Sequence, residues 1–187
     1  MKIIIGLGNP GKEYKTTRHN AGFLCADFLR KELGFASFVG NQKMSADISR
    51  GVLNDEKILI AKPQTFMNRS GAAVSALIKF YKLSVSDIVV IHDDLDITLG
   101  KFKISASSRS AGHNGIQNII DTLGTKNFLR VRLGIGGQVQ LGSGLIGHID
   151  ASDFVLQNFS PEEFVTLTKI FPEVKEKLSG SLFGESK

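Results

Sequence analysis

The feature that most constrains the fold is a pair of short, uninterrupted apolar runs, each followed at once by polar residues. Residues 3–5 are three isoleucines that precede a glycine-rich loop, and residues 88–91 read IVVI before the polar motif HDDLD. Such runs are typical of strands in a sheet that helices cover on both faces. Loops at strand ends often hold binding and catalytic groups. The sequence therefore directs attention to the segments that follow these two strands.

The rest of the chain alternates between strand-like and helix-like segments. Strands are predicted at residues 3–7, 44–53, 57–61, 88–92, 101–105 and 128–135, and helices at 20–33, 71–82 and 114–123. A last helix begins at Ser160 with a capping box and reaches Leu178, with an interruption expected at Pro172. We therefore predict an α/β fold, a single-domain sandwich over residues 1–187 with a mixed, mostly parallel twisted sheet flanked by helices.

Composition limits the class of protein. The 187 residues suffice for one sizeable core, and no apolar stretch reaches the roughly 18 residues of a membrane span. The N-terminus lacks the pattern of a signal peptide, so we expect a cytoplasmic protein without a membrane partner. The single cysteine, Cys25, excludes an intramolecular disulfide and lies among apolar residues, where packing is its expected role. The net charge of +5 is compatible with a solvated basic surface or with a polyanionic partner.

The segment GLGNPG at residues 6–11 satisfies the dinucleotide pattern G-x-G-x-x-G. That pattern needs a helix that begins within the glycines and an acidic residue at the end of the next strand. Here Pro10-Gly11 indicates a turn, and Asp27 falls within a predicted helix. A dinucleotide-dependent oxidoreductase is therefore the less favoured alternative.

Four histidines are candidates for a catalytic base. His19 lies in a polar loop that enters a helix, where it is either solvated or catalytic. His92 is inside a strand, so its side chain and that of Asp93 point to opposite faces. His113 precedes a predicted helix and is a candidate capping residue, whereas His148 lies in a glycine-rich loop and carries little signal.

The carboxylates at residues 93, 94 and 96 follow the second apolar run. They could bind a metal, cap a following element or orient an imidazole. No further ligand set is evident, so we expect no metal, and the orienting role fits Asp93 best because a carboxylate fixes the imidazole tautomer and stabilises the imidazolium. The sequence has no G-x-S-x-G elbow, P-loop or His-Glu-x-x-His helix, which disfavours several common hydrolase and transferase classes.

Three asparagines stand at junctions between predicted elements: Asn9, Asn68 and Asn114. Asparagines at such junctions are often helix caps, and Asn114 fits that role. An amide donor can also hold a substrate or stabilise a developing oxyanion. Phe66 and Met67 precede Asn68, which leads us to expect a partly enclosed position for it.

Considered together, these motifs resemble the bacterial-type peptidyl-tRNA hydrolase family. The matching blocks are GLGNPG at 6–11, Tyr14, TRHNAG at 17–22, PQTFMNRSG at 63–71, HDDLD at 92–96, GHNG at 112–115, RVRLGIG at 130–136 and DFVL at 153–156. The blocks occur in the family's order and cover nearly the whole chain, so the resemblance is specific although each block alone is weak.

The resemblance implies a monomeric, metal-independent esterase without a cofactor, which cleaves the ester between a nascent peptide and the 3′-terminal ribose of tRNA. It assigns His19 as the catalytic base and Asp93 as its orienting carboxylate. It further assigns the substrate-positioning residues Asn9, Tyr14, Asn68 and Asn114 and the tRNA-binding pair Lys103 and Arg132. A base–carboxylate pair without a serine or cysteine nucleophile suits attack by an activated water. A non-catalytic RNA-binding relative is the alternative, but the presence of the catalytic residues disfavours it.

Two basic pairs support a tRNA partner. Lys101 and Lys103 alternate with apolar residues, as do Arg130 and Arg132, so we expect all four to lie on solvent-facing sides of neighbouring strands. The loop SSRSAG at residues 107–112 departs from the family, which is usually richer in glycine here. Arg109 places a bulky charge in that loop, where the family often has a small residue.

Overall fold

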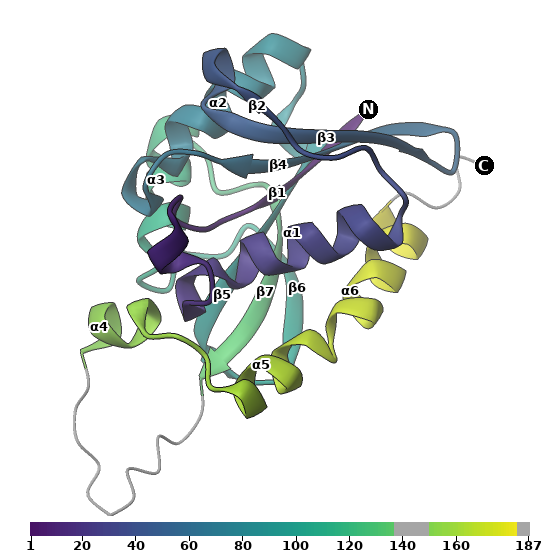
Figure 1. The fold of residues 1–187 in the computed structure, drawn as a ribbon. Helices are drawn as coiled ribbons and strands as arrows, with labels where there is room; N and C mark the ends of the chain where they lie inside the picture. The colour runs from purple at the N-terminus through teal and green to yellow at the C-terminus, as the bar shows by residue number, and fades with distance from the viewer. Residues whose placement is uncertain (137–149, 183–187) are drawn as a thin grey trace, which may run out of the picture.

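The computed structural model describes residues 1–136 and 150–182, and its centre is a seven-stranded mixed sheet (Figure 1). The strands are β1 (Lys2–Gly6), β2 (Val39–Asn41), β3 (Ala46–Leu53), β4 (Glu56–Pro63), β5 (Ile88–Thr98), β6 (Phe102–Ala106) and β7 (Leu129–Gly136). Their order across the sheet is β2-β3-β4-β1-β5-β7-β6. The four central strands are parallel, and β2, β3 and β6 are antiparallel at the two edges. The predicted fold class is confirmed.

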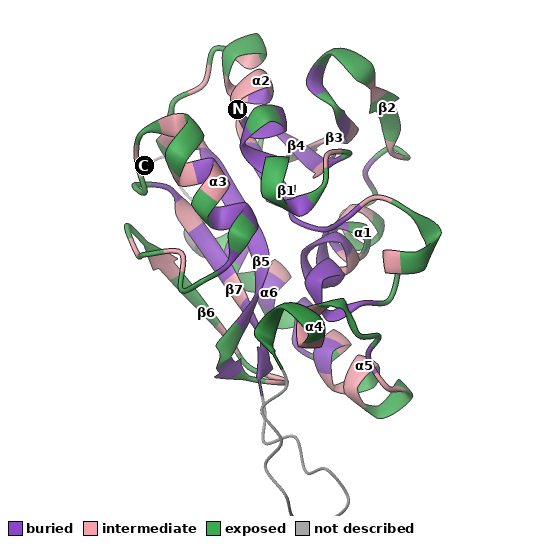
Figure 2. Cartoon of the chain, turned by 90° about the vertical axis from the view of Figure 1, so that its left-hand side faces the viewer, coloured by how far each residue is buried: buried purple, intermediate pink, exposed green. Residues whose placement is uncertain are grey.

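Helices cover both faces of the sheet (Figure 2). They are α1 (Ala21–Glu32), α2 (Ser70–Tyr81), α3 (Asn114–Leu123), α4 (Ala151–Leu156), α5 (Pro161–Thr168) and α6 (Phe171–Lys177). One core packs α1, α5 and α6 against the sheet, and a second packs α2 and α3 against the other face. Successive residues of β1 alternate between the cores, because Ile4 belongs to the first and Ile3 and Ile5 to the second. This double burial explains the uninterrupted apolar runs.

Element boundaries differ from the predictions in informative places. The strand expected at residues 88–92 continues to Thr98, because Asp93 and Asp94 still pair with β7 opposite Leu133 and Gly134. The acidic residues are thus part of the sheet rather than of a loop after it. An interruption of the last helix was expected at Pro172. The helix is interrupted just before it: α5 ends at Thr168, and α6 starts three residues later at Phe171, with Pro172 in its first turn.

Two elements were not predicted, β2 and α4. The first is a three-residue edge strand with no buried residue, and the second is a six-residue helix, also with none. Neither carries enough apolar periodicity to be recognised. His148 lies outside the described residues.

The loop after β1 does not have the geometry of a dinucleotide site. Residues 12–14 form a single 3-10 turn, and α1 begins only at Ala21. A close contact between backbones instead fixes the start of α1: a Cβ on Gly22 would lie 2.4 Å from the carbonyl oxygen of Ile91 and 2.5 Å from the nitrogen of Leu7. Only glycine allows this approach, which places the residues just before α1 beside the end of β5.

Within residues 1–136 and 150–182, no helix combines the length and apolar character needed to cross a bilayer.

Candidate active site

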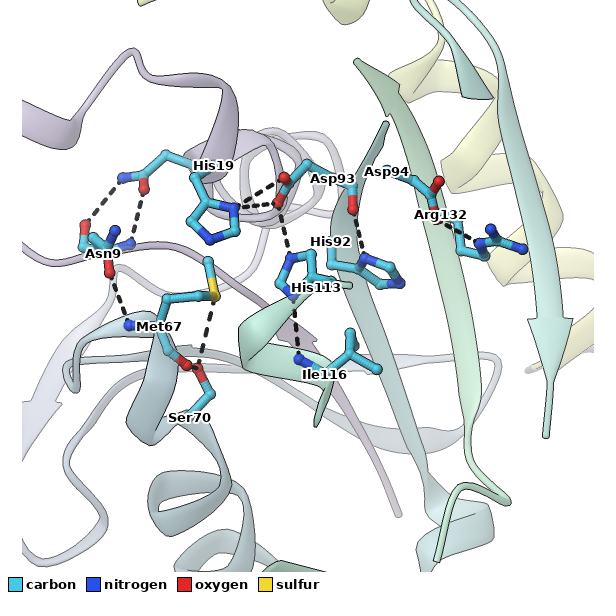
Figure 3. Close-up of polar contacts among 11 residues, drawn as sticks. Asn9, His19, Met67, Ser70, His92, Asp93, Asp94, His113, Ile116 and Arg132 are labelled. Carbon is cyan, nitrogen blue, oxygen red and sulfur yellow. Dashed lines mark hydrogen bonds and ion pairs between the residues drawn. The ribbon is translucent and has the colours of Figure 1, made fainter. Parts of the chain in front are cut away.

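The carboxyl ends of the parallel strands bring three separate segments to one edge of the sheet (Figure 3). Asn9 follows β1, the 3-10 turn η4 (Met67–Arg69) follows β4, and Asp93 is the middle residue of β5. His19 comes from the 3-10 turn η2 (Arg18–Asn20), which the close approach of α1 holds beside β5.

His19 and Asp93 form a direct pair. The Nδ1 atom of His19 lies 2.9 and 3.0 Å from the two carboxylate oxygens of Asp93, and both side chains are buried. With a proton on Nδ1 donated to the carboxylate, the Nε2 atom carries the lone pair and is the basic nitrogen. The prediction that Asp93 orients His19 agrees with this geometry.

Asp93 also contacts a second imidazole, which sequence reasoning did not foresee. The Nε2 atom of His113 lies 3.0 Å from Oδ1 of Asp93. The Nδ1 atom of His113 accepts the backbone N–H of Ile116 at 3.2 Å and caps α3, as the sequence suggested. Because Nδ1 accepts, the proton of the neutral ring is on Nε2, which therefore donates to Asp93. The sequence predicted that His113 caps the helix, but it did not predict the contact of Nε2 with Asp93.

The carboxylate of Asp93 is held in its charged form. Burial by itself raises the pKa of Asp93, but electrostatic attraction and hydrogen bonds from the two imidazoles, His19 and His113, outweigh burial and bring the pKa far below its ordinary value. Asp93 is 2% exposed. The site therefore contains a fixed, nearly water-free negative charge, which favours a positive charge on the neighbouring imidazole.

His92 lies behind this cluster. Its Nδ1 atom donates to the backbone carbonyl of Asp93 at 2.6 Å, and its ring packs edge-on against His113 at 4.7 Å between centroids. Burial lowers the pKa of His92 well below its ordinary value. As predicted from strand alternation, His92 does not line the site with Asp93. It is a neutral ring that packs against His113.

Asn9 is held in one orientation by its neighbours. Its backbone N–H donates to Oδ1 of Asn20 at 2.8 Å, and Nδ2 of Asn20 donates back to its carbonyl at 3.0 Å. The backbone N–H of Met67 donates to Oδ1 of Asn9 at 2.8 Å. This bond commits the amide oxygen, so that Nδ2 of Asn9, which makes no hydrogen bond within the described residues, remains as a donor for a substrate. Asn20 is a supporting residue that the sequence analysis missed, although it lies in the same TRHNAG block.

The other predicted substrate residues lie around this centre to different degrees. Asn114 is exposed at the first turn of α3 and lines the same cavity as His19. Tyr14 is half-buried, and its ring meets that of Phe66 edge-on at 6.4 Å. Asn68 is exposed and does not line the cavity, so the expectation of an enclosed position is wrong. The reason is that Met67 turns into the core and leaves its neighbours on the surface.

A cavity of about 320 Å³ opens beside the pair formed by His19 and Asp93. Its walls come from η2, from the middle of β5, from the start of α3 with the loop before it, and from α4. The lining residues are His19, Asp93, Asp94, Leu95, Ala111, Gly112, His113, Asn114, Asp150, Ala151, Ser152 and Val155. The cavity combines apolar surface with several polar groups, as binding sites for small groups usually do. A substrate in it would lie against the imidazole of His19.

Three residues beside the cavity have the side-chain types that ligate metals. In the described part of the chain, His19, Asp93 and His113 form one group whose potential ligand atoms lie within 4.8 Å of one another. A metal on this group would need the lone pair of Nε2 of His113, but that nitrogen bears the proton while Nδ1 caps α3. The donor set therefore fits a hydrogen-bonded array better than a metal centre.

The basic strands β6 and β7 lie next to each other. Lys103 pairs directly with Arg132 across the two strands, and Lys103 is exposed. The Nε atom of Arg132 donates to Oδ2 of Asp94 at 2.7 Å, an ion pair that sequence reasoning did not foresee. This pair orients the guanidinium and leaves its remaining N–H groups for an anion.

Arg130 corrects one expectation. It was predicted to face solvent with Arg132, but it is 1% exposed. Its guanidinium donates to the backbone carbonyls of Ser108 and, at 3.1 Å, of Arg109. The loop after β6 folds over this part of the sheet, so strand alternation alone could not show which arginine stays outside. Arg109 itself is exposed.

Known proteins with related sequences and structures share one description. The family described as peptidyl-tRNA hydrolase matches residues 3–186. A peptidyl-tRNA hydrolase from Geotalea daltonii is 43% identical over 93% of this chain and 86% of its own length. One from Dehalococcoides mccartyi is 44% identical over 96% of this chain and 92% of its own length.

Solved structures agree with the sequences. A crystal structure of peptidyl-tRNA hydrolase from Acinetobacter baumannii is similar with a TM-score of 0.85 and 30% identity, covering 98% of this chain and 90% of that one. A complex of peptidyl-tRNA hydrolase with N-propanol gives a TM-score of 0.87 at 30% identity, with 98% and 89% of the two chains covered.

Proposed function

Because this chain belongs to the peptidyl-tRNA hydrolase family and hydrolyses the ester bond of peptidyl-tRNA, we propose that His19 is the general base of that reaction and Asp93 its orienting carboxylate. The observation that carries this assignment is the buried contact of 2.9 Å between Nδ1 of His19 and Asp93 at the wall of the cavity. The contact presents Nε2 of His19 as the basic nitrogen.

In the proposed reaction, Nε2 of His19 removes a proton from a water molecule as that water attacks the ester carbonyl. Negative charge develops on the carbonyl oxygen and positive charge on the imidazole, which Asp93 stabilises. When the tetrahedral intermediate collapses, the protonated imidazole returns the proton to the departing ribose oxygen. General-base assistance contributes roughly 10² to 10⁴ in rate, and an ester needs less assistance than an amide.

Amide donors supply the second part of the proposal. Nδ2 of Asn9 is a fixed donor because Met67 holds its amide oxygen. Together with the side chain of Asn114 at the cavity wall, it positions the ester and stabilises the oxyanion. Tyr14 and Asn68, which lie further out on the surface, contact the peptide portion in this scheme.

Lys103 and Arg132 form the proposed tRNA contact. They are direct neighbours across β6 and β7, and Arg132 is oriented by Asp94, the residue after Asp93. A lysine and an arginine side by side suit a terminal phosphate, which they bind without reading sequence. The 5′-phosphate of the tRNA is the group that we assign to this pair.

The proposal also includes a monomeric, cytoplasmic enzyme with one domain over residues 1–187, which uses neither metal nor cofactor. The hydrogen-bonded state of His113 supports the metal-free part. Peptidyl-tRNA arises during translation, which supports the cytoplasmic part.

The direct test is hydrolysis of an N-blocked aminoacyl-tRNA, followed by the release of the free blocked amino acid. The wild-type protein should release it, and His19→Ala should be slower by at least about 10². Activity of His19→Ala close to that of the wild type would remove His19 from the reaction. Tight binding of a nicotinamide dinucleotide with no ester cleavage would contradict the hydrolase assignment altogether.

A further inference from the structure

Arg18, the residue before the proposed base, has a side chain that is almost fully buried and engaged on every side. It is 7% exposed. Its Nη2 atom donates to both carboxylate oxygens of Glu163 at 2.9 and 2.7 Å, and Nη1 donates to the carbonyl of Asn158 at 3.1 Å. The guanidinium lies 4.3 Å from the ring centroid of Phe154, within cation–π range. An arginine that donates to a carboxylate and to a backbone carbonyl and also stacks on a ring is held more firmly than one in a surface ion pair.

The main chain around Arg18 is tied to the same C-terminal segment. The N–H of Arg18 donates to the carbonyl of Gln157 at 3.0 Å, and the N–H of Phe159 donates to the carbonyl of Thr16 at 3.0 Å. The loop that carries the base is therefore bonded to residues 157–159, which connect α4 with α5.

Helix α4 needs these contacts to keep its place. It has six residues, none of them buried, and a helix of that length is not stable in isolation. Ala151, Ser152 and Val155 of this helix line the cavity, while Phe154 lies against Arg18. The same guanidinium thus contacts the helix that forms one wall and belongs to the loop that forms another.

We propose that Arg18 is a positioning residue that holds the loop of His19 and helix α4 as one unit. The proposal rests on the hydrolase function proposed above. By fixing the two walls to each other, Arg18 sets the distance between the basic nitrogen and a substrate that lies against α4. Arg18 touches neither the cavity nor the reacting atoms, so its effect is on geometry rather than on chemistry.

The chain offers a matched control in Lys62. Lys62 forms an ion pair with Asp27 at 2.7 Å, and its Nζ lies 4.3 Å from the ring centroid of Phe38, but it does not line the cavity. Arg18→Met and Lys62→Met each remove one ion pair and two cation–π contacts while keeping an unbranched side chain. Both should lower the thermal midpoint, and only Arg18→Met should alter catalysis.

For N-blocked aminoacyl-tRNA, Arg18→Met should lower kcat by about tenfold to 10², as a misplaced base does, and raise KM by roughly threefold or more. A purely structural role would lower only the fraction of folded enzyme, which scales kcat and leaves KM unchanged. Phe154→Leu, which keeps the ion pair with Glu163, should produce the same rise in KM. Arg18→Lys keeps the positive charge but has one nitrogen in place of the two that donate from the guanidinium. Its kcat and KM should lie between those of the wild type and Arg18→Met, and it replaces Arg18→Met if that variant does not fold.

The coupling is wrong if Arg18→Met behaves like Lys62→Met in kcat and KM, or if Phe154→Leu leaves both constants unchanged. Adding Phe154→Leu to Arg18→Met should lower kcat/KM little further, because both substitutions remove the same contact between Arg18 and Phe154. If the two effects on kcat/KM multiplied in full, the proposal would also be contradicted. A wild-type protein that does not release the blocked amino acid would instead refute the proposed function, before any variant is compared.

Discussion

The two nitrogens of His113 have separate tasks, so two substitutions should separate them. Asparagine is among the best N-cap residues and its side-chain oxygen can accept the N–H of Ile116, but it is too short to reach Asp93. Glutamine can extend an N–H to Asp93 in place of Nε2 but is a poor cap. His113→Asn therefore removes the bond to the carboxylate and keeps the cap, and His113→Gln does the reverse.

The size of the effect follows from the bond that is lost. A hydrogen bond to a charged group contributes about 1.5 to 3 kcal/mol. In His113→Asn the charge of Asp93 is balanced by His19 alone, so it favours the protonated form of that imidazole more strongly than before. If about half of the lost energy acts there, at 1.36 kcal/mol per pH unit, the acid limb of the kcat/KM profile moves to higher pH by roughly 0.5 to 1 unit.

The assay is hydrolysis of N-blocked aminoacyl-tRNA between pH 5 and 8, together with thermal unfolding of each variant. His113→Asn should shift the acid limb and change the thermal midpoint little, whereas His113→Gln should keep the limb and lose about 1 kcal/mol of stability with the cap. An unshifted limb in His113→Asn, or equal shifts in both variants, would refute the view that the second imidazole shares the charge of Asp93.

Further predictions concern other parts of the site. Asp93→Asn should retain the fold yet impair kcat, because an amide does not stabilise the imidazolium of His19; near-normal turnover would remove Asp93 from the mechanism. Because the pKa of His92 is lowered in the folded state, protonation of this ring favours the unfolded chain. The contribution of His92 to the free energy of unfolding should be fully present above about pH 6.5 and fall below it by up to about 1.36 kcal/mol per pH unit. His92→Phe should make this fall less steep in denaturant unfolding. Activity should survive exhaustive chelation; a loss restored by one divalent ion would contradict the metal-free array. Lys103→Ala and Arg132→Ala should each raise KM for the tRNA substrate and reduce by about one the slope of log affinity against log salt concentration. Cleavage of a substrate that lacks the tRNA body should be unchanged. Equal losses of activity on both substrates would contradict a phosphate-binding role.

The parts of the fold that the sequence predicted are those where periodicity and burial agree. The strand at residues 3–7 was identified by its uninterrupted apolar run, which is buried on both faces of the sheet, and the helix at 114–123 buries Ile116 and Ile119 on one face. The extension of β5 through its acidic residues was missed, since polar residues are expected after a strand rather than inside it. Pairing with β7 and contacts to histidines and an arginine compensate the burial of those carboxylates, and these contacts depend on tertiary structure.

The site shows the same division. His19, Asp93 and Asn9 were named from the sequence, and the structure brings them to one edge of the sheet. The hydrogen bond between His113 and Asp93 could not be predicted from the sequence. It joins positions 20 residues apart, and only the sheet and α3 bring them together in space. Residue type alone gave the capping role and no more.

Alternation along β5 links the two halves of the proposed function. Asp93 points to one side and contacts His19, the proposed base, and Asp94 points to the other and forms an ion pair with Arg132. The carboxylate proposed to support ester cleavage and the one that orients the arginine proposed to bind tRNA are therefore adjacent residues of one strand. A shift of β5 by one residue would exchange the two faces and disrupt both contacts at once. The register of β5 against β7, which places His92 opposite Arg132, is thus the structural condition that both the cleavage site and the phosphate contact require.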